Sequence, residues 1–479
     1  MLFTSLEFLF LFLPIVLGVY FVLADWAKNY WLLLASLFFY AWGEPKFVLV
    51  MLGSIVFNYL AAMLIAGVRK QVKRAEFWCK VVLTIAVVAN LSVLFVYKYC
   101  NFVTDICRSL FPFWQGVIPQ TSFILPIGIS FFTFQAMSYV IDVYRGIPVQ
   151  KNPAFIGLYI ALFPQLIAGP IVRYTTVCRQ IEYRKITFGM FSQGVLRFLY
   201  GFNKKMLLAN LFAIVADKAF EASDLSVSMA WLGAICYTLQ IFFDFSGYSE
   251  MAIGLGLMFG FNFPMNFNYP YISKSVTEFW RRWHISLGSW FRDYLYFPLG
   301  GSRVKNPARM LFNLFVVWFV TGFWHGANWT FILWGVLNGV LITIEKLTSL
   351  PQKMDAGAWW RWIYQPFTLL SVVCGLVIFR ALTLSDALVY LKTMFGFSGN
   401  AWIDNEFLFN FGEIKWILLA GILCSAPVLK KLTQRIAVKH LRCAKAMTIV
   451  GYAFQILFFM IGISYLVMNA HNPFIYFNF

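Results

Sequence analysis

The sequence predicts an all-α, polytopic membrane protein. The 479-residue chain is 61% hydrophobic and 20% aromatic, only 12% of it is charged, and its mean hydropathy is +0.73. These values lie far outside the range of soluble globular proteins. Twelve apolar runs are long enough, or nearly so, to cross a bilayer as helices. They cover about residues 6–24, 30–42, 47–67, 80–98, 122–141, 206–221, 228–245, 310–325, 328–346, 362–382, 414–430 and 446–468.

Charged loops orient these runs. Basic residues cluster at 69–80 and at 430–445, whereas acidic residues mark 217–224 and 404–413. Basic loops stay in the cytoplasm, so we expect the basic clusters inside and the acidic segments outside. Twelve crossings then place both termini on the outer face. The first run follows no basic region and precedes no small-residue cleavage site, so we expect a retained helix rather than a signal peptide.

Two stretches do not fit simple spans. Residues 153–172 are apolar but contain three prolines and two glycines, which predicts a re-entrant or buried segment. Residues 246–309 begin with glycines and prolines and continue into an arginine-rich part that is too polar to span and too aromatic for a free loop. We place this stretch at or within the cytoplasmic half of the membrane.

The chain shows no repeat, low-complexity tract or linker that would separate domains. We therefore expect one integral-membrane domain over residues 1–479, with a catalytic core at about 122–346 and an aromatic tail at 471–479. The positive-inside bias explains the net charge of +18 better than a nucleic-acid partner does.

The sequence lacks the motif spacings of metal-binding, nucleotide-binding and serine-hydrolase sites. The eight cysteines form no CxxC pair, and neither HExxH nor a P-loop occurs, so we expect no metal and no tightly bound cofactor. The order Asp244-Phe245-Ser246-Gly247-Tyr248 lacks the first glycine of the serine-hydrolase elbow. The glycines between Gly254 and Gly260 indicate helix packing rather than a nucleotide loop.

Histidine is the side chain best suited to proton transfer near neutral pH. Two of the four histidines, His284 and His325, fall within residues 271–334. His325 stands at the join of two apolar runs, just before Gly326 and Asn328. Apolar surroundings favour the uncharged imidazole, which can take a proton from a hydroxyl as a general base. The alternative is a histidine that only hydrogen-bonds a neighbouring helix.

His284 follows Arg281 and Arg282 on what the pattern indicates is one amphipathic helix, on which Glu278, Arg281 and Arg282 lie about one turn from one another. Two interpretations stay open. This segment only makes an intrahelical pairing with Glu278, or it contacts the phosphates or pantetheine of a donor.

Four ordered blocks resemble the membrane-bound O-acyltransferase family, most closely its bacterial branch that includes alginate O-acetyltransferase. They are Asp244–Ser249 (DFSGYS), Glu278–Leu287 (EFWRRWHISL), Arg292–Gly301 (RDYLYFPLGG) and Phe323–Ala327 (FWHGA). The Phe39–Gly43 element and the terminal Asn472–Phe477 are also similar to that branch, so the resemblance covers nearly the whole chain.

The resemblance implies a ring of about 11–12 tilted transmembrane helices, with re-entrant or broken helices around a central funnel or tunnel, in the bacterial cytoplasmic membrane. It implies transfer of an acetyl group from a cytoplasmic thioester, acetyl-CoA or an acyl carrier. The acceptor would be an extracytoplasmic polysaccharide, either alginate-like or peptidoglycan, reached through an SGNH-type or similar partner transferase. His325 matches the essential histidine and His284 the second position. Arg281, Arg282 and Arg292 would meet the phosphates of the donor.

The tail at residues 471–479 is too aromatic to stay in water, so we expect it to fold back into the outer funnel. The resemblance suggests that Tyr476 carries the acyl group briefly after His325 removes the phenol proton. The alternative is an aromatic anchor at the membrane interface. A polysaccharide exporter or an export-complex scaffold is the rival function. Inverted repeats and mid-span acids would favour a transporter, but no repeat is visible and few acidic residues lie within the spans.

Overall fold

All regular elements of the protein are helices in the residues that the computed structural model describes. These residues are 1–71, 74–111, 113, 117, 121–350, 353, 359–439, 441–468 and 471–473. Eight of the described helices are long and apolar enough to cross a membrane. They are Val48–Lys70, Ala75–Leu110, Val227–Met258, Pro307–His325, Trp329–Thr348, Trp362–Arg380, Asn405–Cys424 and Ala446–Val467, and Phe8–Val22 is a shorter apolar helix. The protein is therefore the all-α, multi-pass membrane protein that the composition predicts.

Each of the twelve expected runs lies largely on a helix, but some of these helices are too short or too polar to be among the eight. Helix α6 (Ile129–Tyr144) has 16 residues, which corresponds to about 24 Å at 1.5 Å per residue, less than the ~30 Å apolar core of a bilayer. Almost all of its residues are buried. Neighbouring helices rather than lipid therefore surround α6. Helices α2 (Asp25–Gly43) and α11 (Asn210–Glu221) also carry expected runs.

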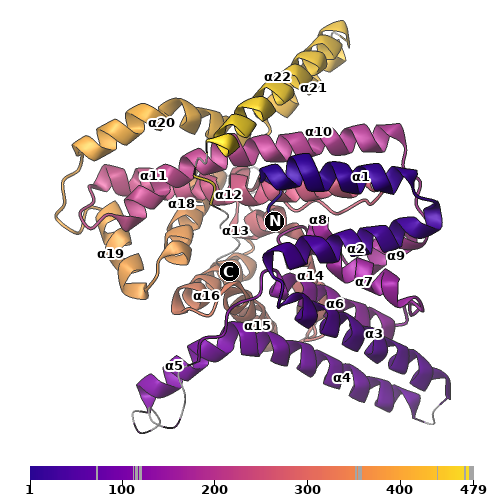
Figure 1. Ribbon diagram of the computed structural model, residues 1–479. Helices are drawn as coiled ribbons and strands as arrows, with labels where there is room; N and C mark the ends of the chain where they lie inside the picture. The colour runs from indigo at the N-terminus through magenta and orange to yellow at the C-terminus, as the bar shows by residue number, and fades with distance from the viewer. Residues whose placement is uncertain are drawn as a thin grey trace. The chain divides into compact units, whose positions relative to one another are not determined.

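The chain forms two compact units, and the first comprises Met1–Val195 and Ala252–Pro264. In this unit α3 (Val48–Gln71), α4 (Ala75–Leu94) and α6 pack side by side (Figure 1). The proline-rich stretch at 153–172 forms α7 (Pro153–Ala161), α8 (Phe163–Leu166) and non-helical backbone, and nearly all of it is buried. This is the broken, buried segment that its prolines predict.

The second unit comprises Leu196–Met251 and Met265–Phe479. In it α15 (Pro307–His325) and α16 (Trp329–Thr348) form an antiparallel pair, and α18 (Trp360–Arg380) packs on α16 (Figure 1). The two helices approach closely because Gly335 has no side chain. A Cβ atom at this position would lie 2.6 Å from the carbonyl oxygen of Trp318. Only glycine permits that approach at this position.

Helix α12 (Val227–Met258) is longer than the sequence suggests. We expected the regular span to end at residue 245, but the helix continues for thirteen further residues. The expectation was wrong because Gly247 allows close packing instead of breaking the helix. A Cβ atom there would lie 2.7 Å from the carbonyl oxygen of Gly201 on α10 (Phe188–Lys204).

The remaining elements connect or flank these helices. They are η1 (Phe8–Phe12), α1 (Leu13–Val22), η2 (Phe95–Tyr99), α5 (Cys100–Leu110), α9 (Tyr174–Glu182), η4 (Lys205–Ala209), η5 (Pro270–Ile272), α13 (Val276–Arg282), α14 (Ile285–Phe291), η6 (Arg292–Tyr296), α19 (Leu384–Met394), α20 (Asn405–Cys424), α21 (Val428–Lys439) and α22 (Leu441–Val467).

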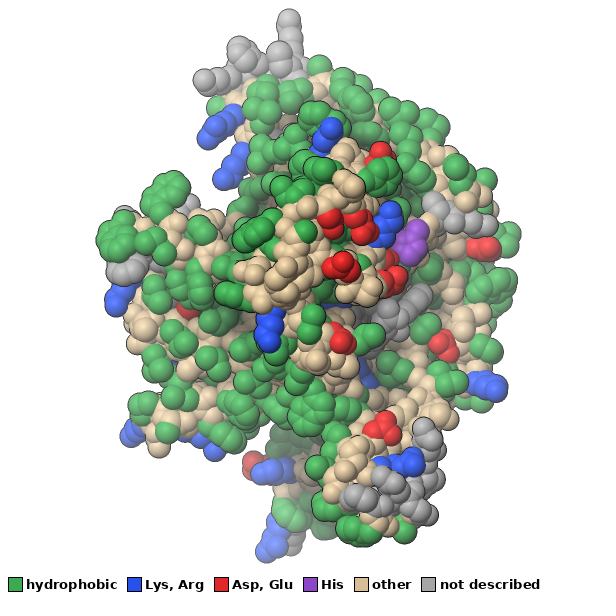
Figure 2. Space-filling view, turned by 90° about the vertical axis from the view of Figure 1, so that its left-hand side faces the viewer, with side chains coloured by type: hydrophobic (Ala, Val, Ile, Leu, Met, Phe, Trp, Pro, Cys, Tyr) green, Lys and Arg blue, Asp and Glu red, His purple; other side chains and the backbone are tan. Residues whose placement is uncertain are grey.

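Hydrophobic side chains cover much of the face seen in Figure 2. Large apolar residues such as Phe409 and Trp416 of α20 are 65% and 72% exposed. A soluble protein rarely shows such a continuous apolar surface. Lipid is the solvent that fits this surface.

Candidate active site

His325 is the last residue of α15, at the turn that leads into α16. The helix ends there because Gly326 adopts an extended conformation, and the Asn328 side chain then caps α16 by accepting a hydrogen bond from the Thr330 N–H at 3.2 Å. His325 is only 4% exposed. The turn between two apolar helices thus holds an imidazole inside the protein, as the sequence predicts.

Aromatic rings surround this imidazole. The centroid of the His325 ring lies 4.9 Å from Trp324, 5.1 Å from Trp334 and 5.2 Å from Phe379, and each ring meets it edge to face. These contacts hold the imidazole in one orientation.

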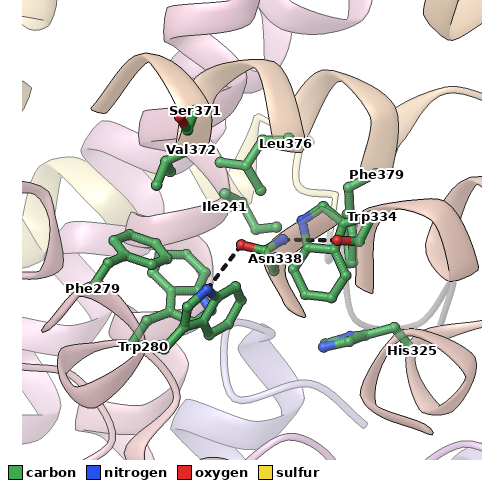
Figure 3. Close-up of a pocket in the computed structure, with 12 residues that line it drawn as sticks. Ile241, Phe279, Trp280, His325, Trp334, Asn338, Ser371, Val372, Leu376 and Phe379 are labelled. Atoms are coloured by element: carbon green, nitrogen blue, oxygen red, sulfur yellow. Dashed lines mark hydrogen bonds between the residues drawn. The ribbon is translucent and has the colours of Figure 1, made fainter. Parts of the chain in front are cut away.

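His325 also lines a narrow cavity of about 20 Å³ (Figure 3). The other lining residues are Ile241, Phe279, Trp280, Trp283, Trp334, Asn338, Ser371, Val372, Gly375, Leu376 and Phe379. The wall is mainly aromatic and aliphatic. A hydrogen bond of 2.9 Å from the Trp280 indole N–H to the Asn338 Oδ1 atom fixes one side of it. Asn338 in turn donates to the Trp334 carbonyl at 2.9 Å. The cavity is therefore a preformed, largely apolar space with one titratable side chain.

His284 does not continue the helix of Arg281 and Arg282, contrary to the sequence prediction. Helix α13 ends at Arg282, and His284 precedes α14 with a left-handed backbone conformation (φ 45°, ψ 52°). The intrahelical pairing with Glu278 is made by Arg282, at 2.8 Å. The His284 imidazole Nδ1 atom lies 3.1 Å from the Oδ1 atom of Asn266.

Asn266 decides which nitrogen of His284 carries a proton. The same Oδ1 atom accepts hydrogen bonds from the Ser286 N–H at 3.2 Å and the Ser286 hydroxyl at 2.9 Å. A backbone N–H can only donate, so the atom facing it is an oxygen, and His284 must donate through Nδ1. The buried Nε2 atom is then unprotonated, and it has no hydrogen-bond partner among the described residues. Burial lowers the pKa of His284 to about 3, so the ring stays neutral at physiological pH.

The structure brings the two histidines together around one indole. The Trp324 ring centroid lies 6.2 Å from that of His284 and 4.9 Å from that of His325. On its other side His284 meets the ring of Phe245 at 4.6 Å. The blocks Glu278–Leu287 and Phe323–Ala327, which contain the two histidines, therefore lie beside each other at one site.

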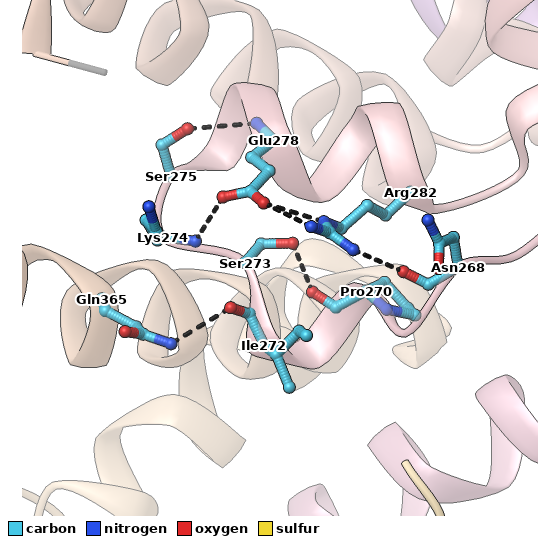
Figure 4. A network of polar contacts seen from close by, with 9 residues as sticks. All are labelled: Asn268, Pro270, Ile272, Ser273, Lys274, Ser275, Glu278, Arg282 and Gln365. Carbon is cyan, nitrogen blue, oxygen red and sulfur yellow. Dashed lines mark hydrogen bonds and ion pairs between the residues drawn. The ribbon is translucent and has the colours of Figure 1, made fainter. Parts of the chain in front are cut away.

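The three arginines lie outside this aromatic cluster. Arg282 pairs with Glu278 at 2.8 Å and donates to the Asn268 carbonyl at 3.0 Å (Figure 4). Arg281 is exposed, and the largely exposed Arg292 pairs with Asp293 at 2.8 Å. Their contact with a donor phosphate stays a prediction.

Sequence reasoning missed Glu345, which is fully buried on α16. Its carboxylate accepts hydrogen bonds from the N–H groups of Val276 and Thr277 at 2.6 and 2.8 Å, and from the Tyr364 hydroxyl at 2.9 Å. It thereby fixes the start of α13, whose Phe279 and Trp280 line the cavity. A lone carboxylate in an apolar run is the signal that could have found it.

A second missed feature is a buried ion pair between Lys205 of η4 and Asp244 of α12. The two charged groups are 2.7 Å apart, and their side chains are 3% and 1% exposed. Lys205 also donates a hydrogen bond to the carbonyl of Pro473 in the C-terminal segment. Tyr476 lies outside the described residues, so its position relative to His325 stays a prediction.

One face of α12 connects these features. Ile241 lines the cavity, Asp244 pairs with Lys205, and Phe245 contacts His284. Residues three and four apart share one face of a helix. The cavity, the ion pair and the second histidine therefore meet along a single turn of this helix.

Known proteins are similar to this chain in sequence. The family model described as MBOAT, membrane-bound O-acyltransferase family, matches residues 77–384. The chain is 39% identical to the probable alginate O-acetylase AlgI of Pseudomonas putida over the full length of both proteins. It is 44% identical to that of Pseudomonas aeruginosa over 83% of this chain and 75% of the relative. It is also 34% identical to the peptidoglycan O-acetyltransferase of Helicobacter pylori, over 100% of this chain and 98% of the relative.

Proposed function

Because this chain belongs to the membrane-bound O-acyltransferase family, we propose that it takes an acetyl group from a cytoplasmic thioester and moves it across the membrane. The acetyl group then modifies hydroxyls of a cell-envelope polysaccharide. The observation that carries this proposal is the buried His325 at a preformed cavity, inside the region that the family model matches.

The relatives support a polysaccharide acceptor. Alginate O-acetylases match at 39% and 44% identity and a peptidoglycan O-acetyltransferase at 34%. The higher identities favour an alginate-like exopolysaccharide over peptidoglycan. The same relatives support an acetyl donor, because their names describe O-acetylation.

In the proposed reaction His325 acts as the general base. It takes the proton of the Tyr476 phenol, and the phenolic oxygen attacks the thioester carbonyl carbon. A C–O bond forms, the C–S bond breaks, and the thiolate of CoA or of an acyl carrier leaves with the proton from His325. The acetyl-tyrosine ester then passes the group to an extracytoplasmic partner transferase, of SGNH type or similar.

Contacts of the described tail residues support the carrier step. The Pro473 carbonyl binds Lys205, which pairs with Asp244, and Asp244 lies one helical turn from the cavity residue Ile241. Three residues of extended chain reach about 10 Å. The proposed carrier Tyr476 follows this anchor by three residues in the sequence.

The proposal includes an orientation. We place the protein in the bacterial cytoplasmic membrane with both termini outside, since basic clusters at 69–80 and 430–445 favour the cytoplasm. The exposed Arg281 and Arg292 then face the side from which a phosphate-bearing donor arrives.

Purified protein with radiolabelled acetyl-CoA tests the reaction, with CoA release and acetyl-protein as readouts. We expect His325→Ala to lower both by about 10²–10⁴-fold, the usual contribution of a general base. We expect Tyr476→Phe to abolish acetyl-protein, while the control Tyr465→Phe on α22 keeps it.

Two results would contradict parts of this proposal. Full CoA release by the His325→Ala protein would remove that residue from catalysis. Full polysaccharide acetylation by a Tyr476→Phe strain would exclude the carrier step and leave His325 to activate another hydroxyl.

A further inference from the structure

We propose that Lys205, Asn210 and Asp217 form a docking site for the C-terminal segment of the same chain. We propose further that this site positions the segment for acyl transfer. The second part rests on the proposed function, whereas the first rests only on contacts of the described residues 471–473.

The three contacts follow the chain inward. His471 Nε2 lies 2.8 Å from the Oδ2 atom of Asp217, and the Asn210 amide donates to the Asn472 Oδ1 atom at 3.2 Å. Lys205 donates to the carbonyl of Pro473. Three successive tail residues therefore each bind a different polar side chain of η4 and α11.

Burial increases along this path. The His471 side chain is 48% exposed and that of Asp217 is 28% exposed, but that of Lys205 is only 3% exposed. The segment thus enters at the surface and reaches a buried cation. Figure 2 shows acidic side chains gathered beside a histidine on one face of the protein.

At its buried end the docking site offers the Lys205 ammonium group as a hydrogen-bond donor to a backbone carbonyl. An ammonium group has three donors, and Asp244 holds that of Lys205 at 2.7 Å. Pro473 takes another of these donors through its carbonyl. A hydrogen bond from a charged donor in a buried site is stronger than one between neutral groups. Lys205 therefore fixes the deepest described residue of the tail.

The outer end is fixed as well. Asp217 shares its two carboxylate oxygens between His471 and Arg380, whose guanidinium lies 2.5 Å from Oδ1. The guanidinium also stacks on Phe220 and Tyr237, at 4.4 and 4.8 Å from the ring centroids. Arg380 follows Phe379, which contacts His325. The residues that hold the tail are thus neighbours of the residues that hold the proposed base.

The test compares docking with transfer in the purified full-length protein. The first variant is Lys205→Met/Asp244→Asn, which removes both charges together and leaves neither buried alone. The second is Asp217→Asn. The matched control is Arg197→Met/Glu250→Gln, because this pair also joins α10 to α12 but does not include a contact with residues 471–473.

Trimming by carboxypeptidase Y, followed by intact mass, measures docking. Loss of a hydrogen bond from a charged donor shifts such an equilibrium by at least about tenfold. We therefore expect at least about tenfold faster removal of residues 471–473 from Lys205→Met/Asp244→Asn and no change in the control. Asp217→Asn should give a smaller increase of about two- to fivefold, because its contact with His471 is partly exposed. We expect acetyl-protein formation to fall in parallel.

The outcomes separate the two parts of the proposal. Unchanged trimming in both variants would exclude the docking site. Faster trimming with full acetyl-protein formation would exclude the positioning role. A wild-type protein that is trimmed slowly but forms no acetyl-protein would overturn the proposed function and leave the docking site standing.

A variant in the C-terminal segment itself keeps the test valid if the substitutions at Lys205 and Asp244 unfold the protein. His471→Ala/Asn472→Ala removes two of the three contacts without changing a residue of η4 or α11. We expect it to be trimmed at least about tenfold faster than the wild type, and an unchanged rate would again exclude the site.

Discussion

A single buried amide determines the chemical state of His284. Asn266 accepts three hydrogen bonds through one oxygen, and the imidazole must supply one of them from Nδ1. The unprotonated Nε2 atom is buried, and the ring contacts both Phe245 and Trp324. A neutral ring that cannot rotate can accept a hydrogen bond from a hydroxyl or a substrate group. It does not add a charge beside His325.

Asn266→Ala tests this residue-scale argument. We expect the loss of about 1–3 kcal/mol of stability, because His284 and Ser286 lose a buried acceptor. Thermal unfolding in detergent measures the loss. Asn268→Ala is the control, since Asn268 is exposed and gives Arg282 its backbone carbonyl, and we expect a change within about 0.5 kcal/mol. Equal stability of both variants would contradict a structural role for Asn266.

At the scale of elements, α13, α16 and α18 build the cavity, and α12 connects it to the rest of the site. Glu345 of α16 binds the first N–H groups of α13, so that this short helix has a fixed start. Trp280 of α13 then binds back to Asn338 of α16. Two polar contacts thus hold a seven-residue helix that could not be stable alone. These hydrogen bonds thus fix the position of α13, which carries two of the residues that line the cavity.

Gly375 of α18 offers a test of the cavity. A Cβ atom there would lie 3.6 Å from the Trp334 ring, which is an ordinary contact, so we expect Gly375→Ala to keep the wild-type rate within about twofold. Gly375→Leu would project into the narrow space. We expect its CoA release to fall by about tenfold or more, because the donor carbonyl can no longer approach His325.

Initial rates at several acetyl-CoA concentrations measure this effect. Unfolding temperatures of the two variants show whether the leucine also disturbs the fold. A Gly375→Leu protein with the wild-type rate would mean that the donor does not enter this cavity.

At the scale of the whole molecule, charge distribution sets the expected orientation in the membrane. Acidic residues at 404–413 precede and surround the start of α20, and basic residues at 430–445 follow its end. The helix therefore separates two regions of opposite charge. By the positive-inside rule we expect the acidic end outside and the basic end in the cytoplasm.

Alkaline phosphatase fusions check this orientation, since the enzyme needs disulfides that form outside the cytoplasm. We expect activity when phosphatase follows Asp404 and no activity when it follows Arg435. The opposite pattern would invert the topology. It would also place the tail, and with it the proposed acceptor reaction, on the wrong side.

The sequence by itself determined the class of the protein and identified the two histidines as candidate site residues. In a bilayer, the backbone of a long apolar run must form its hydrogen bonds within the run, so the run becomes a helix. This constraint depends only on the local sequence. Ordered blocks around His284 and His325 identified both histidines, which the structure places around Trp324. Their chemical roles stay predictions.

Only the tertiary structure decided the partners of these residues. Asn266, Glu345 and the ion pair of Lys205 with Asp244 are contacts between segments that lie 18 to 69 positions apart. The continuation of α12 through Gly247 likewise depends on the neighbouring backbone at Gly201. A buried polar group must find a partner, but the path of the whole chain determines which one. For this reason the sequence identified the histidines, while only the fold identified the side chains that contact and position them.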